Sequence, residues 1–381
     1  MQASASERCA APSVQESASL EIGKPIEREI PGGQSHSYKI TLISGQYLHI
    51  VVERRGIDVA VALFTPDGKK TGEVDDKQST EGAEDISAIA EAPGSYRIEV
   101  RSPEKTAKAG RYEIKVEALR EATAEDKYRV DGESIFREAE QLKDGALEDK
   151  RKSVEKYHQA LELYRRASDR NWESQILNNL GEVYWSLGER QKALETVNEA
   201  LSIRRALGDR LGEVTTLNNI GVAYRLSGEM QEALEKFNEA LPIVRAIGDR
   251  QGEAFTITNI GMVYESLGEP QKALDKYNEA LPILQAIGER EGEAVVLNNI
   301  GAVYQSLGEP QEALEKYNEA LPIRRAIGDR QGEAVALNNI GEVYQSLGEM
   351  QKALDKFSEA LPIRRAIGDR RGEAITLHNI G

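Results

Sequence analysis

A unit of 40 residues recurs along the second part of the chain and constrains its fold more than any other feature. The tripeptide Gly-Asp-Arg, or Gly-Glu-Arg in one copy, returns at this fixed step, beginning at Gly208, Gly248, Gly288, Gly328 and Gly368. A fixed period in this range is typical of solenoids, in which each unit packs on its neighbours. We therefore expect a chain of stacked, similar units.

Each unit has the pattern of two helices joined by tight turns. In the copy at 291–327, apolar residues recur at helical spacing until Gly308, Pro310 suits the first turn of a second helix, and Gly328 follows its end. One pair cannot bury both of its faces, so copies must stack. The predicted solenoid spans 121–381, with helix pairs at about 131–167, 171–207, 211–247, 251–287, 291–327 and 331–367 and a truncated pair at 371–381.

Prolines recur within the second helix of the later copies, at Pro242, Pro282, Pro322 and Pro362. A proline inside a helix removes one backbone hydrogen bond and costs about 3 kcal/mol. Two interpretations remain open. The proline kinks a continuous helix, or the helix ends early.

The repeat resembles the tetratricopeptide repeat. The resemblance rests on the spacing Leu180-Gly181, Tyr184, Gly188, Ala193, Val197 and Ala200, which returns 40 residues later as Ile220-Gly221, Tyr224, Gly228, Ala233, Phe237 and Ala240. The usual unit has about 34 residues. Longer copies with Leu-Asn-Asn-Ile/Leu-Gly are similar to those of kinesin light chains and of bacterial multi-repeat proteins. The resemblance covers about Asp131 to Gly381, with a degenerate first copy.

Residues 21–120 have a different pattern, an alternation of apolar and polar residues broken by Gly and Pro turns. Short alternating runs of this kind predict an antiparallel β-sandwich. The endings Gly94–Val100 and Gly110–Val116 share the form G-x-Y-x-I-x-V, which resembles bacterial pre-peptidase C-terminal domains. That resemblance implies an accessory binding module without chemistry of its own. Residues 1–20, rich in Ala, Ser and Glu, are expected to be a disordered leader.

The charge and the start of the chain limit its partners and its location. The net charge of −15 argues against nucleic-acid binding, and no apolar run is long enough to insert in a membrane. The lone Cys9 cannot form an internal disulfide or a Cys-rich zinc site. No signal peptide is recognisable, which favours the cytoplasm unless the N-terminus is truncated. The compartment and the oligomeric state stay open.

Residue patterns of known catalytic sites are missing from the sequence. It has no P-loop, GxGxxG or HExxH motif, so we expect no enzyme activity and no cofactor. An acidic segment contains Asp75, Asp76, Glu81, Glu84 and Asp85. Hard cations prefer such oxygen ligands, but the spacing fits no calcium loop, and a solvated acidic loop is favoured over a metal site.

The resemblance implies that the first helices of the pairs line a concave groove where partner peptides lie. A row of asparagines recurs there, at Asn179, Asn219, Asn259, Asn299, Asn339 and Asn379. Their amides can bind a peptide backbone, or they can join neighbouring helices. Specificity is expected at positions that vary between copies, and we predict groove contacts from Trp185, Val222, Arg225, Phe255, Met262 and Gln305.

These features predict a non-enzymatic scaffold whose helical groove binds a peptide or protein segment, with the sandwich as an accessory module. Two alternatives remain. The chain resembles the non-catalytic part of bacterial proteins with a caspase-like peptidase domain of the CHAT class, which would make it the regulatory arm of an effector beyond residue 381. Alternatively, the sandwich binds a glycan or a cell surface. The sequence does not identify the partner.

Overall fold

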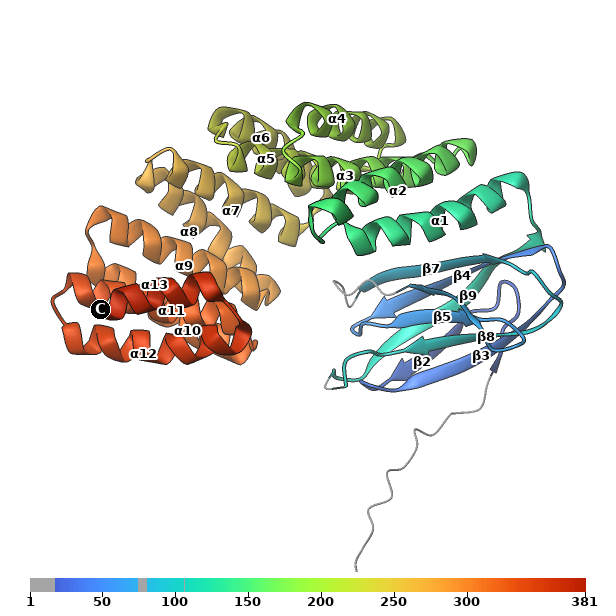
Figure 1. The fold of residues 1–381 in the computed structure, drawn as a ribbon, viewed down its shortest axis with the longest axis horizontal. Coiled ribbons are helices and arrows are strands. Elements are labelled where there is room, and N and C mark those ends of the chain that lie inside the picture. Colours follow the sequence, from blue (N-terminus) through green and yellow to red (C-terminus); the bar gives the residue numbers. More distant parts are fainter. Residues whose placement is uncertain (1–17, 75–80, 106) are drawn as a thin grey trace, which may run out of the picture. The chain divides into compact units, whose positions relative to one another are not determined.

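The computed structural model describes residues 18–74, 81–105 and 107–381, and the chain forms two compact units, Met1–Glu173 and Ser174–Gly381. Strands occupy the first part of the chain and helices the rest (Figure 1). The predicted fold class, a sandwich followed by a helical solenoid, is confirmed. The first unit also includes the first two helices.

The first unit contains two sheets. One has the strand order β1-β3-β8-β5-β6 and the other β2-β9-β4-β7. The strands are β1 (Ala18–Ser19), β2 (Ile26–Ile30), β3 (Ser35–Leu42), β4 (Gln46–Arg55), β5 (Ala60–Phe64), β6 (Lys70–Val74), β7 (Glu81–Ile89), β8 (Gly94–Arg101) and β9 (Gly110–Glu121). Apart from the short parallel pair β1–β3, the paired strands are antiparallel.

Alternating apolar residues form the core between the sheets, as the period-two pattern predicts. Tyr38, Ile40 and Leu42 of β3 are buried, while the residues between them are more exposed. Tyr112 of β9 places its hydroxyl 2.6 Å from that of Tyr38 and 2.7 Å from Nδ1 of His36. These three buried polar side chains therefore satisfy one another, and burial raises the pKa of Tyr112.

The expected leader ends earlier than predicted. Ala18 and Ser19 form β1 beside β3, and Leu20 is buried in the core, because its apolar side chain reaches the space between the sheets. Residues 1–17, including Cys9, lie outside the described residues.

The acidic segment is in part a strand, which the sequence reading missed. Asp75 and Asp76 lie outside the described residues, but β7 begins at Glu81. Glu84 is buried with its carboxylate 3.0 Å from Arg54, and Asp85 lies 3.4 Å from Nε2 of His49. A solvated loop is therefore wrong for Glu84, because a buried cation compensates its charge.

Two helices complete the first unit, α1 (Ala124–Leu142) and α2 (Leu147–Arg166). Helix α1 lies along β7, and Arg137 donates a hydrogen bond to the carbonyl of Glu73 in β6 at 3.0 Å (Figure 1). Both strands are at sheet edges, so α1 covers backbone that would otherwise be open to pairing. One turn from Arg137, Glu133 is largely buried, with Arg137, Asp85 and His49 as its charged neighbours.

Glu133→Gln tests this junction through pH. Burial raises the pKa of Glu133 from 4.5 to about 7. Between these values the folded state holds a proton that the unfolded state releases, so the carboxyl lowers stability as pH rises through this window. We expect the glutamine variant to lack that decline and to gain up to about 3 kcal/mol relative to the wild type between pH 4 and 8. Urea unfolding at both pH values measures it, and parallel pH profiles would contradict the burial.

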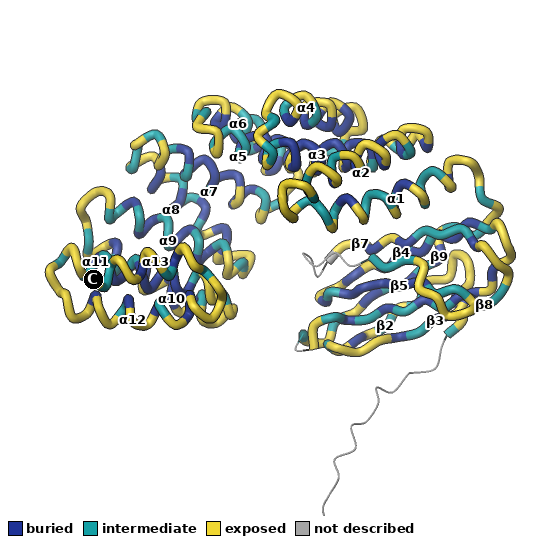
Figure 2. The backbone as a smooth tube through the Cα atoms, viewed as in Figure 1, coloured by how far each residue is buried: buried dark blue, intermediate teal, exposed yellow. Residues whose placement is uncertain are grey.

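Helix α3 (Arg170–Ser186) passes into the second unit, which contains the later helices of the chain. These are α4 (Arg190–Leu207), α5 (Arg210–Leu226), α6 (Met230–Ile247), α7 (Arg250–Ser266), α8 (Pro270–Ile287), α9 (Arg290–Leu307), α10 (Pro310–Ala326), α11 (Arg330–Ser346), α12 (Met350–Ile367) and α13 (Arg370–Ile380). Facing sides of these helices are buried and the turns are exposed (Figure 2).

The Gly-Asp-Arg turn both ends one helix and begins the next. Gly248 has a φ of 75°, a left-handed conformation that glycine adopts without strain, and its N–H bonds the last turn of α6. Asp249 then accepts a hydrogen bond from the amide of Gly252 at 2.9 Å, which caps α7. The repeated tripeptide is thus a C-cap followed by an N-cap.

The interior prolines lie within continuous helices. Pro242, Pro282, Pro322 and Pro362 are followed by further helix in α6, α8, α10 and α12. The alternative in which each helix ends at its proline is wrong, because the residues that follow, such as Ile283, are still buried against the first helices.

Close packing within each pair depends on a glycine in the first helix. A Cβ atom at Gly301 would lie 2.7 Å from the ring of Tyr317 in α10. The same arrangement places Gly221 against Phe237, Gly261 against Tyr277, and Gly341 against Phe357. The aromatic ring occupies the space that the missing side chain leaves.

Gly301→Ala is therefore expected to destabilise the chain by about 1–3 kcal/mol through overpacking. Combining it with Tyr317→Leu, which makes room, should cost less than the sum of the two single changes. A double-mutant cycle in urea measures the coupling. Additive losses would show that the ring does not limit this site.

Candidate functional site

A buried glutamate fixes the start of each first helix. Glu253 of α7 is 5% exposed and accepts a hydrogen bond from Nε of Arg245 in α6 at 2.8 Å, and it also pairs with Arg250. Equivalent glutamates are Glu213, Glu293 and Glu333. Arg245 also reaches Glu279 of α8 at 2.5 Å. These contacts join each helix pair to the next and set where the first-helix side chains point.

The asparagine row is largely engaged within the protein. Asn219 donates to Glu182 at 2.7 Å, Asn339 donates to Asn298 at 3.1 Å, and Asn379 donates to Glu342 at 3.1 Å, all in the preceding copy. Asn259 donates to the carbonyl of Phe255 at 3.0 Å, and Asn179 accepts from Gln175 at 3.0 Å. The interpretation in which these amides bond within the protein therefore describes them better than the one in which they bind a peptide backbone. Any peptide contact would have to exchange one of these bonds.

Asn299 differs from the other amides of the row. Its buried Nδ2 forms no hydrogen bond of normal geometry among the described residues, and its polar neighbour is the hydroxyl of Tyr277. The row is thus not uniform, because its fourth member lacks the hydrogen bond of normal geometry that the other five make.

Three of the predicted groove residues meet at one pocket. Phe255, Asn259 and Met262 lie one turn apart on α7 and line a pocket of about 380 Å³ between α7 and α9. Val295 and Val296 of α9 form the opposite wall, and Leu284 of α8 is also in the lining. The Phe255 side chain remains half-exposed, at 51%. A half-exposed aromatic side chain in the lining of a pocket is the kind of residue that can anchor an incoming side chain.

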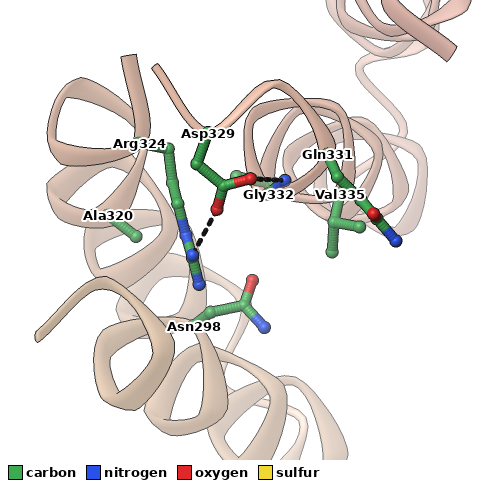
Figure 3. Close-up of a pocket in the computed structure, with 8 residues that line it drawn as sticks. Asn298, Ala320, Arg324, Asp329, Gln331, Gly332 and Val335 are labelled. Carbon is green, nitrogen blue, oxygen red and sulfur yellow. Dashed lines mark hydrogen bonds and ion pairs between the residues drawn. The ribbon is translucent and has the colours of Figure 1, made fainter. Parts of the chain in front are cut away.

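A second pocket occupies the same place one copy later. It measures about 320 Å³ between α9 and α11, with Asn298 and Val335 in its lining (Figure 3). Arg324 extends from the end of α10 to Asp329, and the other oxygen of Asp329 accepts from the amide of Gly332 at 2.8 Å. The position of Arg324 corresponds to Leu284, 40 residues earlier.

The remaining predicted contacts lie outside this pocket. Val222 packs against the cluster around Phe237. Trp185 contacts the ring of Tyr224 edge-on, with 6.2 Å between centroids. Gln305 accepts a hydrogen bond from Tyr317 at 3.1 Å.

Arg225 also lies apart from the pocket. Its Nε is buried without a hydrogen-bond partner in the described structure. The structure thus brings together the Phe255, Asn259 and Met262 group and leaves the other predicted contacts dispersed.

Sequence reasoning missed the pocket residues that come from the end of the second helix, the turn after it and the first turn of the next helix. Leu284 comes from the end of α8, and Glu289 and Glu291 come from the turn and the start of α9. Aligning the copies on their 40-residue period would have shown that Leu284 and Glu291 differ from Arg324 and Gln331.

A model of the tetratricopeptide repeat family matches residues 145–206, 212–286, 253–326 and 332–381, which is more than half of the sequence. The chain belongs to the tetratricopeptide repeat family. Tetratricopeptide proteins are in general scaffolds for protein interaction. The match begins at residue 145, so the resemblance of the sandwich to pre-peptidase C-terminal domains stays a prediction, as does the CHAT relationship.

Several solved structures are similar to this chain. Apo RapI superposes with a TM-score of 0.52 at 19% identity, covering 68% of this chain and 73% of RapI. BtubC (BKLC) from P. vanneervenii gives a TM-score of 0.45 at 23% identity, covering 65% and 93%. A putative kinesin light chain from Podosopora anserina gives 0.44 at 18% identity, covering 52% and 98%. These similarities concern the fold alone. No curated protein sequence matches significantly.

The part of the chain that the structure describes can also be searched for a membrane-spanning helix and for a metal site. No helix of this part is both long and apolar enough to cross a membrane. The same residues contain no group of three or more His, Cys, Asp or Glu side chains placed to hold a metal ion.

Asn219→Ala tests the structural role of the amide row. We expect it to lower the free energy of unfolding by about 1 kcal/mol, because it removes the bond to Glu182 of the preceding copy. The matched control is Asn299→Ala, which should cost less, since its Nδ2 makes no hydrogen bond of normal geometry in the described structure. Thermal and urea unfolding of both variants measure the difference. A larger loss from the control would contradict the bonding pattern.

Proposed function

We propose that this tetratricopeptide protein binds a peptide or protein segment along the face formed by its first helices. The pocket between α7 and α9 is the central contact. The observation that supports this most directly is that the exposed Phe255 lines a pocket of about 380 Å³ together with Met262 and Val295.

The surrounding structure supports a binding role because it leaves this apolar surface uncovered on a rigid frame. Phe255 is on the solvent side of α7, whereas its neighbours Ala254 and Ile257 are buried in the core. Nothing in the packing of the pair requires an aromatic residue at this position, where the other copies have Gln175, Thr215, Val295, Val335 and Ile375. Large aromatic side chains in such places dominate binding energies at interfaces.

The repetition of the pocket in the next copy also supports an elongated partner. The pockets at α7–α9 and α9–α11 are equivalent positions in successive copies. Adjacent helices pack about 8–10 Å apart, which an extended peptide spans in about three residues. A segment lying across the first helices can therefore place side chains in both pockets.

Phe255→Ala tests the proposal with a displayed library of short random peptides selected on the wild-type chain. We expect the variant to bind the selected peptides at least about tenfold more weakly, which corresponds to about 1.4 kcal/mol. Unfolding of the variant should stay close to that of the wild type because the side chain is half-exposed.

Ile287→Ala is the matched control, since Ile287 is a similarly exposed apolar residue at the end of α8 and is not part of the pocket lining. It should bind the selected peptides as the wild type does. Failure to select any peptide that depends on Phe255 would overturn the proposed binding site.

A further inference from the structure

We propose that the α7–α9 pocket selects a large apolar side chain that is flanked by lysine or arginine in its partner. This inference rests on the proposed function and names the chemistry of the segment that it binds. Its basis is a comparison of two pockets that share one backbone and differ in charge.

The α9–α11 pocket contains a balanced ion pair. The guanidinium of Arg324 meets the carboxylate of Asp329, and Gln331 at the rim is neutral. The α7–α9 pocket has Leu284 in place of the arginine, Glu289 in place of the aspartate and Glu291 in place of the glutamine. One positive charge is lost and one negative charge is gained at equivalent positions.

The charges at the α7–α9 rim are also largely uncompensated. Glu289 accepts a hydrogen bond from the amide of Gly292 and caps α9. Glu291 is exposed and has no ion-pair or hydrogen-bond partner among the described residues. The neighbouring cation, Arg290, is already paired with Glu293 at 2.5 Å. An apolar pocket with an acidic rim favours an apolar side chain between cationic neighbours.

No other copy of the repeat combines these two features. Arginine occupies the position of Leu284 in three copies, at Arg204, Arg324 and Arg364, and the other two have Tyr164 and Val244. The position of Glu291 is held by Asn171, Leu211, Gln251, Gln331 and Arg371. Only the copy that begins with α9 joins an apolar residue from the preceding helix to an acidic residue at the rim.

The geometry of an extended peptide fits this arrangement. Successive side chains of an extended segment point to opposite sides, so the residues on either side of a buried apolar residue stay near the surface. Long lysine or arginine side chains can then turn toward the rim carboxylates while their aliphatic stems cover the apolar wall. The charges add selectivity and faster association to the apolar contact.

The test uses a variant that converts this pocket into the next one, Leu284→Arg with Glu291→Gln. The chain already accommodates the same residue types at Arg324 and Gln331, and Glu289 can pair with the introduced arginine as Asp329 pairs with Arg324. The probes are three synthetic peptides that share a central leucine or tryptophan core from the selected library and differ only in the flanking residues, which are lysine, glutamine or glutamate. Binding is measured by fluorescence anisotropy at low and high salt.

We expect the wild type to bind the lysine-flanked peptide at least about tenfold more tightly than the glutamate-flanked one, with a preference that shrinks at high salt. The double variant should lose or reverse this preference. The matched control is the converse pair of changes in the neighbouring pocket, Arg324→Leu with Gln331→Glu, which should leave the preference at α7–α9 in place.

The outcomes separate this inference from the proposed function. Peptides that depend on Phe255 but show no basic preference, or a preference that survives the Leu284→Arg and Glu291→Gln changes, would overturn the inference and leave groove binding intact. Absence of any peptide that depends on Phe255 would overturn both.

Discussion

The close approach of the two helices in each pair, at a glycine that meets an aromatic ring in the pairs from α5–α6 to α11–α12 and Val197 in α3–α4, is the contact on which the rest of the solenoid depends. At Gly301 the backbone of α9 meets the ring of Tyr317 with no side chain between them. The pair then presents a constant surface to its neighbours, and buried glutamates such as Glu333 lock successive pairs together. Because this frame repeats, a surface position in one copy has a defined counterpart in the next.

Much of this architecture could be predicted from the residues. The 40-residue period gave the phase of the helices, and the spacing of Phe255, Asn259 and Met262 placed them on one face. The strand β7 was not predicted because its acidic residues are typical of a loop. The ion pair in which Arg54 compensates the negative charge of Glu84 forms only in the folded chain. The hydrogen-bond partners of the asparagine amides also depend on how far one copy is shifted in space relative to the next, which cannot be read from the sequence. Leu284 joins the site from another helix for the same reason.

Variation on a constant frame explains how such a protein can acquire specificity. The backbone around the pockets at α7–α9 and α9–α11 is capped in the same way, by Glu289 in one and Asp329 in the other. Exchange of a few side chains changes an ion-paired pocket into an apolar one with an acidic rim. In the proposed function, stability depends on the repeated residues and recognition on the variable ones, so the two can change with little interference.

The row of ion pairs that links successive second helices has a gap. Arg205 reaches Glu239, Arg245 reaches Glu279, and Arg325 reaches Glu359. Gln285 of α8 stands at the position of these arginines. It donates a hydrogen bond to Glu293 at 3.1 Å, and within the described structure it forms no hydrogen bond or ion pair with α10. The row of ion pairs is therefore interrupted between α8 and α10, beside the acidic-rimmed pocket, and apolar contacts such as that of Leu281 with Ala320 and Ile323 join these two helices instead.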